Sequence, residues 1–434
     1  MTDRVRLALV GCGGISARHL EGYQDLHERG CREFEVAACC DLNEELARSQ
    51  AAKIAVFQGK EPRVFRKIED LIASGAADAA DVCVPHCFHH STAISLLEGG
   101  LHVQLEKPLG ITIRASRKII AAARRAGRLL ATAENVRRTL EARACTWAIR
   151  EAKLIGEVIA GETTLIKLKK LDVDEPRKQW RVVKLLTGGG MIIDNGVHFA
   201  DMMLLLFGDV NEVWCTMRTL DECEFENAPI LGRARVDVEN YFHAVIRFAN
   251  GVQVNWTGAN RFHTEEINRG WLCGTQGTIF TREPAMHPFQ HGGTITLADG
   301  RTLSSEKIQA DYLTTLSAEE RDRLFPYGAT NGFSCEIHDF IRAVRTGANL
   351  EMDGEAGLRA KTLCECCYES ATAGRPVKYA DVLAGRVDAY QRPIDEYWKL
   401  LDEKPAAGRP KGHAPEPEGV ASPTGRGSKK SVVA

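Results

Sequence analysis

The chain has 434 residues, of which 44% are apolar and 26% charged, and its formal net charge is −2. This balance lacks the basic footprint of a nucleic-acid-binding protein, no apolar run reaches the ~20 residues that span a bilayer, and the first residues lack the apolar stretch of a secretion signal. We therefore expect a cytoplasmic protein of two or three domains that binds a small molecule, with no nucleic acid and no membrane among its partners.

The first third of the chain alternates short β-branched runs with longer helical patterns, which is typical of βαβ units around a parallel sheet. Helices are predicted from about Ser16, over Asn43–Lys53 and over Ile113–Ala126. Strands are predicted at Arg4–Val10, Phe34–Cys40, Asp81–Val84, His102–Leu105 and Leu129–Ala133. The pattern indicates an α/β fold with a doubly wound parallel sheet.

Three glycines follow the first predicted strand, where a dinucleotide site needs them. Gly11, Gly13 and Gly14 would let a pyrophosphate approach backbone N–H groups at the helix start, although Ser16 stands where the usual fingerprint has a third glycine. Asp41 ends the second strand and could accept hydrogen bonds from the adenosine ribose or cap the next helix. Because no arginine directly follows Asp41 to take a 2′-phosphate, we predict NAD over NADP.

Glu106-Lys107-Pro108 follows the strand His102–Leu105 at its C-terminal end, the edge where open parallel sheets bind ligands. Alcohol oxidation needs a group that takes up the hydroxyl proton near the operating pH. The ordinary lysine pKa of ~10.4 is too high for this, but burial would lower it. Lys107 is therefore a candidate for the reaction site, and a solvated lysine paired with Glu106 is the alternative.

The middle of the chain changes character, and the hairpin signal Asn250-Gly251 falls between two successive strands of an antiparallel sheet. Its strands are predicted at Thr163–Lys169, Val213–Thr219, Tyr241–Phe248, Val252–Thr257, Gly270–Cys273 and Thr278–Thr281. Helices are predicted at Ala144–Leu154, Val197–Phe207 and Cys335–Thr346. Residues 285–331 are predicted to be loop-rich, and the Pro- and Gly-rich tail 403–434 to be disordered.

Asp194 and His198 follow the triplet Gly188-Gly189-Gly190 and are four residues apart. If Asp194 opens a helix, both side chains project from the same side of it. An imidazole has the best-placed ordinary pKa for proton transfer near neutrality, and a carboxylate can orient it. The spacing thus predicts a proton-transfer pair, and the alternative is a helix cap beside a half-buried histidine.

Four segments together resemble the glucose-fructose oxidoreductase / inositol dehydrogenase / MocA family (Gfo/Idh/MocA), with matching order and spacing. They are residues 5–20 (VRLALVGCGGISARHL), 82–89 (VCVPHCFH), 102–109 (HVQLEKPL) and 188–208 (GGGMIIDNGVHFADMMLLLFG). The resemblance implies an N-terminal NAD-binding Rossmann domain at 1–133 and a C-terminal α/β domain at 134–400 with an open-faced, mostly antiparallel sheet. It also implies a homodimer or homotetramer formed through that sheet.

The resemblance also implies roles for single residues. His198 would accept the proton, Lys107 would touch both the nicotinamide ribose and the substrate hydroxyl, and Asp194 would position the substrate and the imidazole. The implied substrate-binding set is Lys107, Trp180, Arg181, Asp194, Asn195 and His198. The implied cofactor-binding set is Gly11, Gly13, Gly14, Ile15, Asp41, Pro85, His86, His89, Glu106, Lys107 and Asn135.

Two groups of residues could bind a metal instead. Cys364, Cys366 and Cys367 could bind a metal, but they do not share one face of the predicted helix. The segment from His86 to His90 could also supply ligands, but hydride transfer to a nicotinamide needs no metal. We therefore predict no metal.

The predicted activity is the NAD-dependent oxidation of a secondary hydroxyl on a sugar, glycoside or cyclitol. Two alternatives stay open, a glycosidase that uses NAD for transient oxidation and a non-catalytic sugar or nucleotide sensor. A sensor would not need Lys107, Asp194 and His198. Residues 220–235 and 285–331 look like insertions, which would either cover the substrate entrance or serve as surface decoration or a subunit contact.

Overall fold

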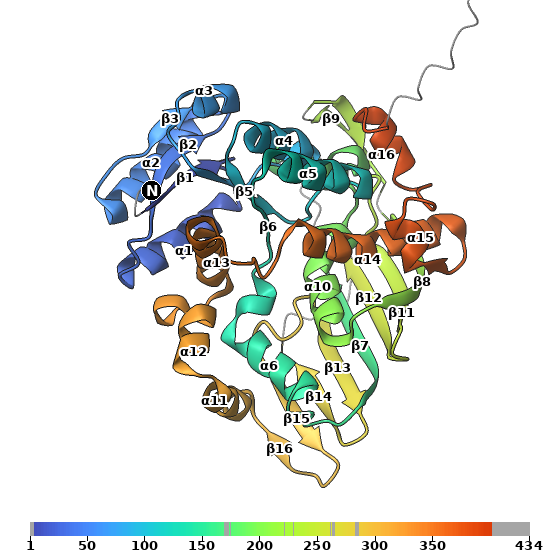
Figure 1. The fold of residues 1–434 in the computed structure, drawn as a ribbon. Coiled ribbons are helices and arrows are strands. Elements are labelled where there is room, and N and C mark those ends of the chain that lie inside the picture. The colour runs from blue at the N-terminus through green and yellow to red at the C-terminus, as the bar shows by residue number, and fades with distance from the viewer. Residues whose placement is uncertain are drawn as a thin grey trace, which may run out of the picture. The chain divides into compact units, whose positions relative to one another are not determined.

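Six parallel strands in the order β3-β2-β1-β4-β5-β6 form the first sheet (Figure 1). The computed structural model describes residues 4–168, 173, 175–220, 222–228, 230–260, 262, 265–282 and 286–401. The strands are β1 (Val5–Val10), β2 (Phe34–Cys40), β3 (Arg63–Phe65), β4 (Ala79–Val82), β5 (His102–Glu106) and β6 (Leu130–Ala133). This arrangement confirms the doubly wound parallel sheet.

Helices cover both faces of the first sheet. They are α1 (Ser16–Glu28), α2 (Glu44–Gln58), α3 (Ile68–Ala73), α4 (His89–Glu98) and α5 (Ile113–Ala126). Successive side chains of β1 point to opposite faces. Leu7 and Leu9 join a buried cluster with residues of α1 and α2, whereas Ala8 and Val10 join the cluster that contains residues of α4 and α5.

The second sheet has nine strands in the order β16-β15-β14-β13-β7-β12-β11-β8-β17. Only β7 and β12 pair in parallel, and the other neighbours are antiparallel, which confirms the mostly antiparallel sheet. The strands are β7 (Val158–Lys167), β8 (Val210–Arg218), β11 (Tyr241–Phe248), β12 (Gln253–Asn260), β13 (Ile267–Gly274), β14 (Gly277–Thr281), β15 (Gly293–Leu297), β16 (Thr302–Leu303) and β17 (Val377–Lys378). A separate hairpin consists of β9 (Glu224–Ala228) and β10 (Gly232–Arg235).

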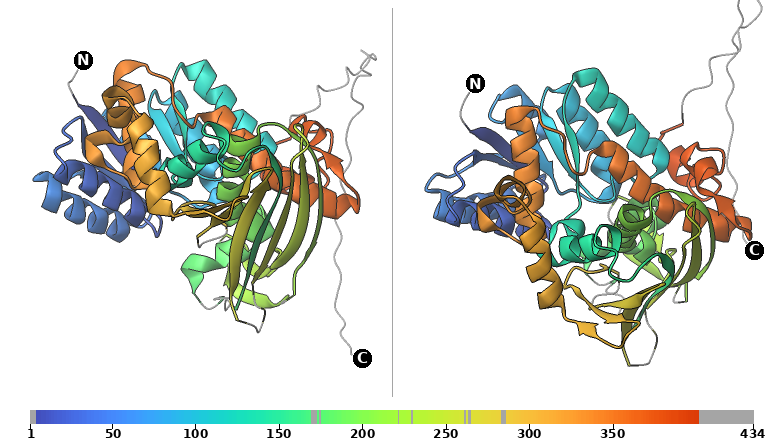
Figure 2. Two further views of the ribbon diagram at one scale, coloured as in Figure 1. Left: turned by 90° about the horizontal axis from the view of Figure 1, so that it is seen from below. Right: turned by 60° about the horizontal axis from the view of Figure 1, so that its bottom comes forward.

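Long helices pack against one face of the second sheet (Figure 2). In α10 (Gly196–Phe207) Phe199 stacks on Trp256 of β12, with ring centroids 4.3 Å apart. Late in the chain, α13 (Gly332–Thr346) packs on α1, and α14 (Gly354–Ala373) contacts α5 and β6 of the first sheet as well as β8 of the second. The C-terminal helices therefore join the two sheets.

The remaining helices are short connections or lie at the edge of the second sheet. They are α6 (Leu140–Arg150), α7 (Pro176–Gln179), α8 (Lys184–Thr187), α9 (Met191–Asp194), α11 (Ser305–Thr315), α12 (Ala318–Leu324), α15 (Tyr379–Leu383) and α16 (Arg392–Tyr397), with 3₁₀ turns η1 (His86–Phe88), η2 (Val136–Arg138), η3 (Trp180–Val182) and η4 (Pro326–Gly328). Within the described ranges no single helix has the length and apolarity to cross a membrane, although the bent pair 184–194 and 196–207 passes that test jointly.

Several sequence predictions need correction, among them the strand predicted at Thr163–Lys169, which is β7 and begins at Val158. The described part of the segment 285–331, residues 286–331, is not loop-rich, because α11, α12, β15 and β16 lie there. Both helices are short, but Ser304 caps α11 and Ser317 forms a capping box at α12. The strand predicted at Asp81–Val84 is β4, which begins two residues earlier. The helix predicted at Ala144–Leu154 is α6, which begins at Leu140 because the Thr139 side chain caps it. The predicted tail 403–434 lies outside the described residues.

Candidate active site

All residues predicted to bind cofactor or substrate line one pocket of about 1250 Å³. Single-ligand pockets usually measure about 300–1,000 Å³. The larger volume suits a dinucleotide with a second molecule beside it. The pocket runs from the turn after β1, past the ends of β4 and β5, to α9 and the start of α10.

The glycine turn forms one end of the pocket. Gly11 has a φ of +85°, and a Cβ there would lie 2.7 Å from the carbonyl carbon of Cys83, so only glycine fits. A Cβ on Gly13 or Gly14 would meet nothing within 4 Å, which leaves an open cradle in front of α1. α1 carries no side-chain cap, and the N–H groups of Ala17 and Arg18 already donate to the carbonyl oxygens of Gly14 and Ile15, so a phosphate would meet the N–H groups of the glycine turn just before the helix. These features fit a dinucleotide.

Asp41 braces the same turn. Its Oδ2 accepts a hydrogen bond from the backbone N–H of Cys12 at 2.7 Å, and Oδ1 accepts one from Asn43 at 2.8 Å. Asn43, not Asp41, caps α2 through the N–H of Glu45. Asp41 thus links the end of β2 to the glycine turn.

The ends of β4 and β5 are tied together by buried histidines. His19 of α1 lies with Nδ1 2.8 Å from Asp81 and Nε2 2.9 Å from Glu106, so the Glu106 carboxylate faces α1. Burial alone would lower the pKa of His19, but Asp81 raises it well above the ordinary value. His89 has one ring nitrogen 2.8 Å from the Pro108 carbonyl oxygen and the other 3.0 Å from that of Val84. These contacts fix the turn that carries Lys107.

Lys107 reaches from this turn to the short helix α9. Its Nζ donates to the carbonyl oxygen of Asp194 at 2.6 Å, and the side chain is half-buried rather than solvated. The Asp194 carboxylate pairs with Arg181. Burial alone would raise the pKa of Asp194, but Arg181 and Lys107 hold it well below its usual range. Asp194 is therefore anionic at neutral pH.

The glycine triplet before α9 is required by close packing. A Cβ on Gly189 would lie 2.2 Å from the Tyr368 hydroxyl, and one on Gly190 would lie 2.4 Å from the Glu239 carbonyl oxygen. Glu239 accepts hydrogen bonds from the N–H groups of Gly190 and Ile192 at 2.8 and 2.9 Å. The start of α9 is thereby anchored, which sets the position of Asp194 at its end.

His198 does not pair with Asp194, contrary to the expectation drawn from their spacing. Asp194 ends α9 and α10 begins at Gly196, so the two residues do not belong to one continuous helix. The imidazole Nδ1 lies instead 2.6 Å from Oε1 of Glu134, the residue after β6. Burial, followed by Lys107, lowers the pKa of His198 to about 3, and burial raises the pKa of Glu134 to about 7.

A second imidazole adjoins this pair. The His287 ring lies perpendicular to that of His198, with centroids 4.7 Å apart, and burial together with His198 lowers the pKa of His287 to about 3. Buried Met286 and Phe289 hold the turn that presents it, before β15. His287 and Gln290 come from one predicted insertion and Ile230 from the other, so both segments reach the pocket.

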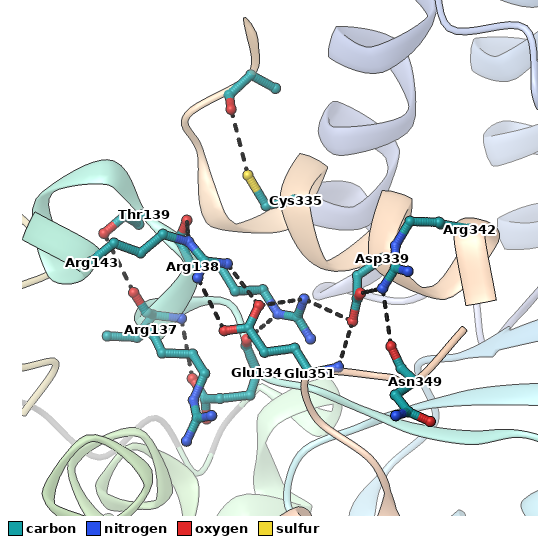
Figure 3. Close-up of polar contacts among 12 residues, drawn as sticks. Glu134, Arg137, Arg138, Thr139, Arg143, Cys335, Asp339, Arg342, Asn349 and Glu351 are labelled. Carbon is teal, nitrogen blue, oxygen red and sulfur yellow. Dashed lines mark hydrogen bonds and ion pairs between the residues drawn. The ribbon is translucent and has the colours of Figure 1, made fainter. Parts of the chain in front are cut away.

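Ionic contacts tie the segment that carries Glu134 to its surroundings. Arg137 of η2 donates two hydrogen bonds of 2.6 Å to Asp201 of α10. Arg138 is buried and lies 3.1 Å from Asp339 of α13 and 3.5 Å from Glu351, which also pairs with Arg143 (Figure 3). The segment after β6, which leads from the first sheet to the second, is therefore held by ion pairs to α10 and to α13.

Trp180 and Arg181, which were predicted to contact a sugar, line the pocket next to α9. Arg181 stands over the Trp180 ring at 4.6 Å, and the same ring meets His86 edge-on with centroids 4.8 Å apart. Trp180 therefore both packs and lines the pocket. Asn195 precedes α10, Asn135 precedes η2 and Pro85 precedes η1, so all three lie at turns on the pocket wall.

Sequence reasoning missed Glu134, Asp201 and His287. Glu134 had a usable signal, because it follows β6 at the same edge of the sheet where Glu106 ends β5. For His287 the local sequence offers no comparable signal. Among the described residues, one group offers three potential metal ligands within 4.8 Å of one another, namely His19, Asp81 and Cys83, and both His19 nitrogens already face carboxylates.

Two sequence models of known families match the chain. Residues 5–134 match the "Oxidoreductase family, NAD-binding Rossmann fold" of Gfo/Idh/MocA, and residues 151–379 match its C-terminal alpha/beta domain. A levoglucosan dehydrogenase from Pseudarthrobacter phenanthrenivorans is 27% identical over 67% of this chain and 77% of its own length. A D-apiose dehydrogenase from Paraburkholderia graminis is 25% identical over 86% and 90%.

Solved structures share the fold. A levoglucosan dehydrogenase in complex with NADH and levoglucosan superposes with a TM-score of 0.67 at 22% identity, over 87% of this chain and 99% of that one.

Proposed function

This chain belongs to the Gfo/Idh/MocA oxidoreductase family, and we propose that it catalyses the NAD-dependent oxidation of a secondary hydroxyl on a sugar, glycoside or cyclitol. The observation that carries the proposal is the meeting of Lys107, Asp194 and His198 in the pocket that begins at the glycine turn. Bound NAD supplies the hydride acceptor. The matched dehydrogenases, by their names, act on such small hydroxylated substrates.

We assign the proton of the substrate hydroxyl to His198. A neutral imidazole can accept it, and the lowered pKa of His198 keeps the ring neutral across the physiological range. Lys107, whose Nζ already donates to the Asp194 carbonyl oxygen, would polarise the reacting oxygen as negative charge develops on it. These two groups supply the proton acceptor and the positive charge that alcohol oxidation needs.

Asp194 and Arg181 would bind the remaining hydroxyl groups of the substrate. Their ion pair presents an acceptor and a donor side by side, and Trp180 next to them offers an apolar face to C–H groups. Asn195 completes the set. A polyhydroxylated ring matches this mixture of charged, amide and aromatic groups better than an apolar substrate does.

We propose that the first domain spans residues 1–133 and the second residues 134–400. We also propose that the cofactor is NAD rather than NADP. Asp41 stands where the adenosine ribose would lie, and a carboxylate there repels a 2′-phosphate. Arg48, which follows within two helical turns, is paired with Glu44. Lys53, Arg66 and Lys67 also line the pocket, so the preference for NAD rests on the carboxylate of Asp41.

A homodimer or homotetramer, located in the cytoplasm, completes the proposal. Trp214 of β8, Trp271 of β13 and Phe280 of β14 fall on one row across the second sheet, on the face opposite Trp256. Trp214 and Phe280 are exposed. The row is aromatic at both ends, and Val245, Asn255 and Glu162 lie between Trp214 and Trp271. Exposed aromatic rings at the two ends of such a row suit contact with a second copy, and light scattering of the purified protein tests it.

The test is to incubate the purified protein with NAD and a panel of free sugars, glycosides and inositols, following NADH by absorbance. We expect NADH formation with at least one polyol. His198→Ala should lower kcat by about 100-fold or more, while NADH binding, followed by fluorescence, stays within about twofold. Hydrolysis of a glycoside without net NADH would favour the glycosidase instead, and binding without turnover would favour a sensor.

A further inference from the structure

A buried carboxylate lies directly behind the imidazole of the reaction site. Oε1 of Glu134 is 2.6 Å from Nδ1 of His198, and it also accepts the backbone N–H of Val136 at 3.1 Å. Both side chains are at least nine-tenths buried. With Nδ1 occupied, Nε2 is the nitrogen of His198 that can meet a substrate hydroxyl.

A second contact holds this pair in register. Arg137 follows Glu134 by three residues, and Asp201 follows His198 by three residues on α10. The bidentate hydrogen bonds between Arg137 and Asp201 therefore run parallel to the contact between Glu134 and His198. Two parallel contacts fix both the distance and the orientation of the imidazole against the carboxylate.

The surroundings of His198 disfavour a positive charge on its ring. The ring is buried beside Lys107, and both effects lower its pKa. A histidine that takes the hydroxyl proton there and keeps its own becomes an imidazolium next to an ammonium. The carboxyl of Glu134 is the neighbouring group that can take up a proton near neutral pH, since burial raises its pKa to about 7.

We propose that His198 passes its Nδ1 proton to Glu134 as its Nε2 takes the proton of the substrate hydroxyl. The C–H bond breaks with its electron pair transferred as hydride to NAD, the hydroxyl O–H bond breaks towards Nε2, and the Nδ1–H bond breaks towards the carboxylate. The products are a ketone, NADH, a neutral histidine with its proton on Nε2, and a neutral carboxylic acid. Glu134 is thus a positioning residue that acts through His198, and this inference rests on the proposed function.

The direction of the pH dependence follows from the two protonation states. When Glu134 is ionised, Nδ1–H donates to it and Nε2 can accept a proton. When Glu134 is protonated, it donates to Nδ1 and the proton on Nε2 blocks the base. The rate of oxidation should therefore be low below about pH 7 and should increase as the pH rises through that value. The ionisable groups that face the pair are Lys107, Glu106, Arg137, Asp194, Asp201 and His287.

The first experiment compares Glu134→Gln with the wild type. The amide keeps a hydrogen bond to the ring but cannot take up a proton. We expect kcat for oxidation above pH 7 to fall about 10- to 100-fold, the rise of kcat through about pH 7 to disappear, and NADH binding by fluorescence to stay within about twofold. Single-turnover rates in mixtures of H₂O and D₂O should curve for the wild type, because two protons move, and be linear for Glu134→Gln.

Glu134→Asp is the conservative partner variant, and Glu141→Gln is the matched control. Glu134→Asp keeps an ionisable carboxyl, so it should retain the acid limb of the pH profile even with a lower kcat. Glu141 lies on α6 outside the pocket lining, and its amide should leave rate and pH profile unchanged. An acid limb lost in Glu134→Asp or in the control would contradict the assignment to Glu134.

The second readout needs no turnover. In ¹⁵N-histidine-labelled protein without ligands, the His198 signals, assigned with His198→Asn, should move from the Nε2–H to the Nδ1–H tautomer with a midpoint near pH 7. Glu134→Gln should abolish that change. If the wild type shows no tautomer change, or Glu134→Gln keeps it together with the acid limb, the inference is overturned. If no polyol is oxidised, the proposed function fails and the substrate step fails with it, whereas the tautomer titration still decides whether Glu134 sets the protonation of His198.

Discussion

At one end of the pocket, backbone groups from a single turn of the chain form the cradle; at the other end, side-chain charges from separate elements meet. The cradle depends on Gly11, Gly13 and Gly14, which are neighbours in sequence. The reaction end depends on Glu134 after β6, Lys107 after β5 and residues of α9 and α10. The first end is made by sterics within one segment, and the second by electrostatic pairing between segments.

This difference sets what each end tolerates. A glycine turn fails when an added atom collides with the backbone, whatever its polarity. A charge pair fails when one partner is removed, because the other charge is then buried alone. The two ends should accordingly respond to different kinds of substitution, one in cofactor affinity and the other in turnover.

The largest expected effect is at the cradle. Gly11→Ala places a Cβ 2.7 Å from backbone atoms of Cys83 in a conformation that only glycine adopts easily. Strain and overpacking should together cost about 4 kcal/mol, measured by chemical denaturation, and weaken NADH binding by more than about 100-fold. Gly13→Ala meets nothing within 4 Å and should leave the unfolding midpoint unchanged. Equal destabilisation by both changes would contradict the steric account.

A smaller effect is expected from the ionic register at the reaction end. Arg137→Met leaves Asp201 buried without its cation, which should destabilise the protein by about 3 kcal/mol and lower kcat about 10-fold. The double variant Arg137→Met with Asp201→Leu should regain stability but not kcat, because the register of His198 depends on the pair. Recovery of both quantities would show that the pair contributes only stability.

The smallest expected effect is at Asp41. Asp41→Ala removes the acceptor for the Cys12 N–H and the one offered to the ribose, so NADH affinity should fall about 10-fold. NADPH affinity should fall less or rise, because the repulsive carboxylate is gone. Isothermal titration with both nucleotides measures this difference. Tighter binding of NADPH than NADH to the wild type would reject the preference for NAD.

The sequence predicted the cradle better than the reaction end. Gly11 to Ile15 form a contiguous pattern whose chemistry is carried by backbone groups, so the spacing alone indicates its use. Lys107, Asp194 and His198 were also singled out, and the structure brings them to one pocket. The carboxylate partner of His198 was not, since Glu134 lies 64 positions away in the chain.

Amino-acid order by itself determined the alternation of strands and helices, the glycine turn and the candidate proton-transfer groups, because these follow from local periodicity and residue chemistry. Only the tertiary structure decided which carboxylate faces the imidazole, that His287 adjoins it, and that α13 and α14 return to the first sheet. Such pairings arise from burial and charge compensation between segments that are distant in the chain, and no local pattern encodes a distance between them.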